Sequence, residues 1–354
     1  MSYSRIVLPR LFNQQIAETK LRTPQELVQW MGAIQSQDFA MGKWAIGLRL
    51  PGMTNSQVES AFNEGKILRT HVLRPTWHFV APEDIRWMLA LSGPRVMAAN
   101  AFMQRKLEID AKLVKRSNDI ICKALEGGKF LQRADLQQAL EKKKITGEKL
   151  RFIYLMMAAE LEGLICSGPR TGRQFSYALL DERVAVPAKK YTREEAIYEL
   201  AVRYFTSHGP ATAADFSWWS GLTLKDAKAA VHGLTGRFRK EIIEGKEYYG
   251  LSFSAPEPDP ARSCFLMPDY DEYAVSYKDR SAIAGAQQLK GEKSAGNLLF
   301  YHLFVIDGTV AGTWKFSDKS RKSAITVKPT GRLSRLQKEL LDHAVKRCLQ
   351  FYAG

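Results

Sequence analysis

The sequence of 354 residues predicts an α+β fold made of tandem winged helix-turn-helix units followed by a small β-rich domain. Two observations support this. The order helix, helix, hairpin appears three times before residue 253, and we call each repeat a module. Three prolines then fall within residues 254–260, and strand-like runs follow them. We expect four domains, covering residues 1–110, 111–188, 189–253 and 260–354.

The first module has clear helix starts. Residues 23–26 combine a threonine N-cap, a proline at the first helical position and the acid of a capping box. A second helix begins near Thr54 and ends at Gly65. Residues 67–80 are rich in β-branched and aromatic types and are interrupted by Pro75, which predicts a hairpin, the wing of the module.

The other two modules repeat the pattern without obvious sequence identity. In the second, the sequence predicts a helix that contains residues 120–125 and stops at Gly127-Gly128, further helices over 131–140 and 148–161, and a wing over 164–179. In the third, a capping box opens a helix over 192–205. Helices over 212–219 and 223–233 and a short hairpin over 238–251 follow.

Strand and hairpin signals predict the last domain. Asp307-Gly308 between two apolar runs is a strong hairpin signal. An amphipathic helix over 332–352 closes the chain. The candidate strands cover residues 264–267, 298–306, 309–316 and 324–327.

The charge balance favours a polyanionic partner. Fifty-two lysines and arginines against 37 acids give a net charge of +15, and the pI is near 9.6. Each neutralised phosphate releases counterions, so double-stranded DNA is the expected partner, although a merely basic soluble protein remains an alternative. The N-terminus lacks a signal-like apolar segment and no run is long enough to span a bilayer, so we expect a cytoplasmic protein with no membrane partner.

Cysteines and histidines show no metal-ligand spacing, and a metal site at an acidic cluster near residue 270 is the less favoured alternative because a fuller ligand set is missing. The four cysteines are far apart in the sequence, which is typical of free thiols in a reducing compartment. Asp269, Asp271 and Glu272 form an acidic cluster, for which we expect a structural role with ion pairs to Lys278 or Arg280. We therefore predict no metal and no cofactor.

Gln35 and Gln37 are the candidate catalytic residues. On a regular helix, positions i and i+2 point well apart, so the two amides converge only if the helix ends near Gln35 and the chain turns or extends. Taken alone, the pair also suits helix capping or backbone hydrogen bonding. Asp38 is interpreted as a helix-terminus or turn residue.

Several cations are candidate DNA contacts. Arg69 and Arg74 lie in the first wing among aromatic residues, and they fit phosphate or groove contact. An ordinary hairpin with Trp77 and Phe79 buried is the alternative. The further candidates, each of which also fits a merely solvated surface, are Lys149, Arg151, Arg170, Arg173 and Lys315.

The chain resembles the AlkZ/YcaQ-type winged-helix family, and the resemblance covers nearly its whole length. The segments that carry it are residues 35–38, 43–49, 69–78, 267–273, 277–280 and 307–314. The resemblance implies three tandem winged-helix modules and a C-terminal β-barrel around a DNA-sized concave channel. It also implies a DNA glycosylase for alkylated purines, including interstrand crosslinks at guanine N7.

The family's catalytic element is Gln-x-Gln in one branch and Gln-x-Asp in another, and Gln35 and Gln37 match the first form. Ser36 stands where an aliphatic residue is common. An N7-alkylated purine is already cationic, so two amide oxygens that orient water and stabilise the sugar cation are a coherent catalyst. We expect a monomeric, monofunctional glycosylase without a lyase step. A non-catalytic DNA-binding regulator is the alternative.

Overall fold

The computed structural model describes residues 4–187, 189–234, 236–254, 263–288, 302–319 and 322–354. Packing contacts divide the chain into two compact units. Unit 1 comprises Met1–Glu59, Ile197–Trp219 and Thr223–Gly354, and unit 2 comprises Ser60–Ala196 and Ser220–Leu222. The four domain boundaries given above remain predictions.

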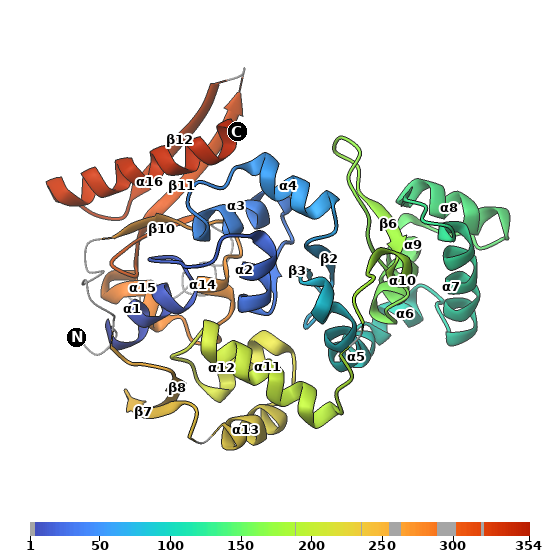
Figure 1. Ribbon diagram of the computed structural model, residues 1–354, viewed down its shortest axis with the longest axis horizontal. Coiled ribbons are helices and arrows are strands. Elements are labelled where there is room, and N and C mark those ends of the chain that lie inside the picture. Colours follow the sequence, from blue (N-terminus) through green and yellow to red (C-terminus); the bar gives the residue numbers. More distant parts are fainter. Residues whose placement is uncertain (1–3, 188, 235, 255–262, 289–301, 320–321) are drawn as a thin grey trace. The chain divides into compact units, whose positions relative to one another are not determined.

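The N-terminal part of unit 1 is helical (Figure 1). The helix predicted from the capping box is α2 (Pro24–Met31), and both hydrogen bonds of the box are present. The sequence did not predict α1 (Ser4–Asn13) or α3 (Phe39–Arg49). The helix expected after Thr54 is α4 (Asn55–Asn63), which continues into unit 2.

The elements of the third module are confirmed. They are α11 (Arg193–Ser207), α12 (Ala213–Ser220), α13 (Leu224–Gly233) and the antiparallel hairpin of β7 (Arg239–Ile243) and β8 (Lys246–Gly250). Phe205 of α11 packs against Phe216 of α12 and Tyr249 of β8, so aromatic rings join these helices to the hairpin.

The C-terminal strands form one open antiparallel sheet in the order β12-β11-β10-β9. Asp307 and Gly308 join β10 and β11 with φ values of 50° and 78°, as a primed hairpin turn requires. The strands are β9 (Cys264–Leu266), β10 (Leu303–Ile306), β11 (Thr309–Lys319) and β12 (Lys322–Pro329). Three helices complete this part, namely α14 (Glu272–Val275), α15 (Ser281–Gln288) and α16 (Arg335–Ala353).

The expected β-barrel is not supported. Within the described residues this sheet has four strands, and none of the sheets closes on itself. Four strands are too few to surround a filled interior, for which about eight are usual. The long helix α16 instead packs against β9 and β12, and Figure 1 shows it beside β12. Most of the expected linker over 254–260, and residues 298–301 of an expected strand, lie outside the described residues.

Unit 2 begins with the predicted wing, in which β2 (Leu68–His71) and β3 (Trp77–Val80) pair antiparallel. A second sheet has the order β4-β6-β5, and its β4 (Leu131–Gln132) replaces the start of the helix predicted over 131–140. The other strands are β5 (Ile165–Ser167) and β6 (Ser176–Leu179). The helices are α5 (Pro82–Ala99), α6 (Ala101–Lys106), α7 (Ala111–Leu125), α8 (Arg133–Lys142), α9 (Lys149–Leu161) and α10 (Leu180–Arg183).

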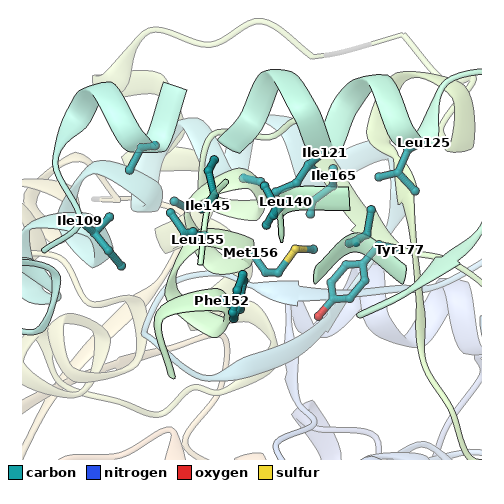
Figure 2. Close-up of a cluster of buried hydrophobic side chains, with 14 residues drawn as sticks. Ile109, Ile121, Leu125, Leu140, Ile145, Phe152, Leu155, Met156, Ile165 and Tyr177 are labelled. Carbon is teal, nitrogen blue, oxygen red and sulfur yellow. The ribbon is translucent and has the colours of Figure 1, made fainter. Parts of the chain in front are cut away.

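A hydrophobic core packs the helices α7, α8 and α9 of unit 2 against its β5–β6 hairpin. Ile121 of α7, Leu140 of α8 and Phe152 of α9 meet Tyr177 of β6 in it (Figure 2). Each helix contributes an apolar stripe, so the core fixes the first turn of α8 beside the β5–β6 hairpin. Trp77 of the wing packs on the edge of the same core.

All four cysteines are free thiols, and all but the half-buried Cys122 are buried. No helix in the described ranges is both long and apolar enough to cross a bilayer. Over the same ranges, no group of three His, Cys, Asp or Glu side chains is placed to hold a metal ion.

Candidate functional site

The chain leaves helix α2 before the Gln35–Gln37 segment and bends at Gln37. Helix α2 ends at Met31, and Gly32 turns the chain with a φ of 79°, a conformation that favours glycine. Strand β1 (Ile34–Gln35) follows. The helix has therefore ended before Gln35, which is the condition that the sequence sets for convergence of the two amides, since a continued helix would separate them.

Asp38 follows Gln37 directly and precedes the next helix. It is the N-cap of α3, and its carboxylate accepts a hydrogen bond of 3.0 Å from the backbone N–H of Met41. This confirms the helix-terminus interpretation of Asp38.

The two glutamines differ in burial. Gln37 is exposed, whereas Gln35 is only 8% exposed. Among the described residues, no group donates a hydrogen bond to the buried Oε1 of Gln35. A buried carbonyl oxygen without a donor costs roughly 1–3 kcal/mol, so this oxygen is suited to accept a hydrogen bond from a water or a ligand.

Glu272 anchors the backbone of Gln35. The N–H of Gln35 donates to Oε1 of Glu272 at 2.6 Å, and Trp219 Nε1 donates to Oε2 at 3.1 Å. The hydroxyl of Ser276 donates to the same Oε2. Glu272 is fully buried, so these donors offset the cost of removing its carboxylate from water.

A buried ion pair stands next to this anchor. Arg49 donates through both terminal nitrogens to the two oxygens of Asp271 at 2.8 Å. Asp271, which was expected to pair with Lys278 or Arg280, thus pairs with a residue of α3. It also caps α14, because Oδ1 accepts the N–H of Tyr273 at 2.8 Å. The prediction of a structural role was right and the predicted partner was wrong, since only the fold brings Arg49 to this position.

Two histidines contact or approach carboxylates of the Asp269, Asp271 and Glu272 cluster. His302 contacts Asp269 through Nδ1. His208 is buried, with Nε2 at 3.7 Å from Oε2 of Glu272. Burial lowers the pKa of His208 despite the nearby carboxylate, so its ring is neutral at pH 7.

In unit 2, the structure brings several predicted DNA contacts together around Phe175. The guanidinium of Arg69 lies 4.4 Å from the ring centroid of Trp77 and 4.9 Å from that of Phe175. Arg170 lies 4.9 Å from the same Phe175 centroid. Arg69 is only 7% exposed, and its contacts with the two rings hold its guanidinium in place. Phe79 is buried and Trp77 half-buried, in keeping with the alternative interpretation of the wing.

Arg69 and Lys149 also line a cavity of about 550 Å³, here called the basic pocket. Its walls come from the wing, the first turn of α8, the start of α9 and the β5–β6 hairpin. The lining residues are Arg69, Trp77, Gln132, Arg133, Ala134, Gln137, Lys149, Ser167, Gln174, Phe175, Ser176 and Tyr177.

The remaining predicted contacts lie elsewhere. Arg151 donates to the backbone oxygens of Thr146 and Glu108, both at 3.1 Å, so it holds its own loop together. Arg74 is half-buried and Arg173 is exposed near the tip of the β5–β6 hairpin. Lys315 is exposed on β11 in unit 1.

Sequence reasoning missed the contact of Glu272 with Gln35 and the position of Arg133 at the start of a helix. Glu272 is 237 positions from Gln35, and no local pattern announces a contact over that separation. Arg133 was placed inside a helix expected to begin at 131. A closer reading of Asp135 as an N-terminal acid would have moved the helix start to 133, as in the structure.

Comparisons with known proteins agree on one family. A protein-family model described as DNA glycosylase AlkZ-like matches residues 28–351. The solved structure of the Streptomyces sahachiroi DNA glycosylase AlkZ is similar, with a TM-score of 0.79 and 18% sequence identity over 99% of this chain and 96% of that chain. No curated protein matches the sequence.

Proposed function

Because the chain belongs to the AlkZ-like DNA glycosylase family, we propose that it hydrolyses the N-glycosidic bond of N7-alkylated purines in DNA, with Gln35 and Gln37 as catalytic residues. The proposal includes purines joined in interstrand crosslinks. The expected product is an abasic site with an intact strand, because the proposed mechanism uses no amine nucleophile.

The chemistry suits neutral amides. Breaking the N-glycosidic bond builds positive charge on the sugar, and an N7-alkylated purine already carries the charge that makes it a good leaving group. The catalyst must hold a water near the anomeric carbon and place fixed dipoles at the developing cation. Amide oxygens supply both functions without a strong base, and an undamaged purine resists so mild a site because it leaves poorly.

The unpartnered Oε1 of Gln35 carries this proposal. The residue is buried, its backbone is fixed by Glu272, and its oxygen lacks a donor within the described part of the chain. An acceptor held in this way is pre-organised for a water or for the sugar, and its reorganisation costs little when the reaction occurs.

We also propose that Arg69, Arg74, Lys149, Arg151, Arg170, Arg173 and Lys315 contact DNA. Exposed Lys149, Arg173 and Lys315 fit phosphate contact directly, since side chains of this kind hold a duplex without reading its sequence. Arg151 already bonds two backbone oxygens, so its expected contribution is the smallest of the set.

The test is release of 7-methylguanine from methylated duplex DNA. We expect release by the natural protein and no release by the double variant Gln35→Ala with Gln37→Ala, at unchanged DNA affinity. Gln29→Ala, an exposed glutamine of α2, is the matched control and is expected to keep activity. A parallel assay on a crosslinked duplex tests the wider substrate range.

Two outcomes would contradict the proposal. Tight DNA binding with no release from any alkylated substrate would leave a DNA-binding protein without this activity. Release that survives the double glutamine substitution would show that the catalytic groups are elsewhere.

A further inference from the structure

We propose that the basic pocket of unit 2 binds an unpaired nucleotide of a DNA strand, with its phosphate among the cations and its base against the aromatic wall. The inference rests on the proposed function for the identity of the polymer and deepens it by naming a second recognition site. Its test uses undamaged DNA, so its outcome does not depend on base release.

The charge of the pocket selects an anion. Three cations line it, namely Arg69, Arg133 and Lys149, and its lining contains no carboxylate. Arg133 and Lys149 are exposed and form no ion pair within the described ranges. The nearest acid of α8 is Asp135, whose oxygen accepts the backbone N–H of Gln132 at 2.9 Å. Arg133 and Lys149 therefore bring two exposed positive charges to the pocket, and the Asp135 carboxylate is not part of its lining.

The start of α8 adds to this preference. Arg133 and Ala134 are its first two residues, and both line the pocket. The first backbone N–H groups of a helix lack intrahelical acceptors and carry partial positive charge, which favours a phosphate there. Lys149 at the start of α9 brings a second helix terminus to the same cavity.

The aromatic wall selects a flat group. Trp77 and Phe175 stack on the guanidinium of Arg69, which gives a layered surface of rings and one cationic plane. Unpaired bases stack on such rings and on arginine planes. Tyr177, buried in the core, closes the wall from behind.

Size and polar groups distinguish a nucleotide from a bare phosphate. The volume of about 550 Å³ lies within the range of small-molecule sites and far exceeds the needs of an inorganic anion. Three glutamines, Gln132, Gln137 and Gln174, line the pocket beside the rings. An amide offers a donor and an acceptor together, the combination that meets a base edge.

The experiment compares three fluorescent duplexes of one sequence by anisotropy. The first is fully paired, the second has a single bulged adenosine, and the third has an abasic tetrahydrofuran unit at the bulge. Because stacking of one base contributes about 1–3 kcal/mol, we expect the bulged duplex to bind at least about fivefold more tightly than the other two. The abasic probe separates base recognition from phosphate binding and from duplex bending.

A blocking variant assigns the preference to the pocket. Ala134 is exposed and lines the cavity, so Ala134→Trp fills it without disturbing the core. Gln138→Trp places the same side chain at an exposed position of α8 outside the lining and is the matched control. We expect the first variant to bind all three duplexes equally and the second to keep the preference for the bulge.

Equal binding of the three duplexes by the natural protein would overturn the inference, and so would a preference that survives Ala134→Trp. Bulge preference without any 7-methylguanine release would defeat the proposed reaction and leave the pocket assignment intact. Release of 7-methylguanine without bulge preference would defeat the pocket assignment and leave the proposed reaction intact.

Discussion

Replacing Glu272 tests how the Gln35 strand is held. Its carboxylate accepts hydrogen bonds from the Gln35 N–H, the Trp219 indole and the Ser276 hydroxyl, and it is fully buried. Glu272→Ala leaves two N–H donors, the backbone N–H of Gln35 and the indole N–H of Trp219, without an acceptor, and neither group can rotate toward another one. At about 1–3 kcal/mol for each, we expect unfolding to become easier by about 2–6 kcal/mol.

Glu272→Gln is the conservative partner of this variant. The amide oxygen can still accept from Gln35, but the new NH₂ group then faces the Trp219 N–H. The Ser276 hydroxyl can rotate to accept, whereas an indole N–H cannot. One lost hydrogen bond to a charged acceptor costs about 1.5–3 kcal/mol, so Glu272→Gln should be the milder variant in urea unfolding.

The rate of base release distinguishes positioning of Gln35 by Glu272 from a role of Glu272 in stability alone. We expect Glu272→Gln, assayed where it is fully folded, to release 7-methylguanine about tenfold or more slowly with unchanged affinity for undamaged DNA, because small displacements of a catalytic group are costly. In a Gln35→Ala background the same substitution should have no further effect on the rate. An equal loss of rate in both backgrounds, or full activity in Glu272→Gln, would refute the role of Glu272 as a positioning residue.

Three further predictions concern unit 1 and the thiols. Arg49→Met leaves the buried Asp271 carboxylate unpaired, so we expect a loss of about 3–5 kcal/mol in the free energy of unfolding, measured in urea. Burial lowers the pKa of His208 below 6.5, so the unfolded chain binds a proton that the folded chain does not, and stability should fall as pH drops below about 6.5. His208→Gln should flatten this slope by up to about 1.4 kcal/mol per pH unit, unlike His343→Gln at an exposed site; equal slopes in urea titrations would contradict this. Burial raises the pKa of three thiols to about 12, so a thiol reagent at pH 8 should label half-buried Cys122 first in mass spectrometry of the native protein; simultaneous labelling of all four would contradict this.

Local signals in the sequence predicted local structure well. The capping box at residues 23–26 and the Asp307-Gly308 turn are both present, because each is built from neighbours whose chemistry admits few conformations. The end of helix α2 before Gln35 meets the condition that the sequence sets for convergence of the two amides, and the convergence itself stays a prediction.

Elements without an exposed face were missed. Ten of the eleven residues of α3 are buried, including Lys43 and Arg49, so its sequence has no polar stripe from which a helical period could be read. Long-range partners were missed for a different reason. The pairing of Glu272 with Gln35 and of Asp271 with Arg49 depends on tertiary packing that propensities do not encode.

The prediction of a C-terminal β-barrel came from the family resemblance, and the structure does not support it. The sequence identified most of the strands, and neighbouring strands of the sheet are antiparallel, as hairpins require. The number of strands decides whether a sheet can close into a barrel, and the four strands of the described residues do not suffice.

The division of the chain has a consequence for its biosynthesis. Unit 1 takes residues from the beginning, the middle and the end of the chain, whereas unit 2 is almost one continuous run. A ribosome completes residues 60–196 well before it reaches Glu272, and domains fold as their residues emerge. The backbone of Gln35 therefore lacks its hydrogen bond to Glu272 until the ribosome has added that residue, 237 positions later. A nascent or prematurely terminated chain can display a folded unit 2 while the proposed hydrolytic residues still lack their anchor.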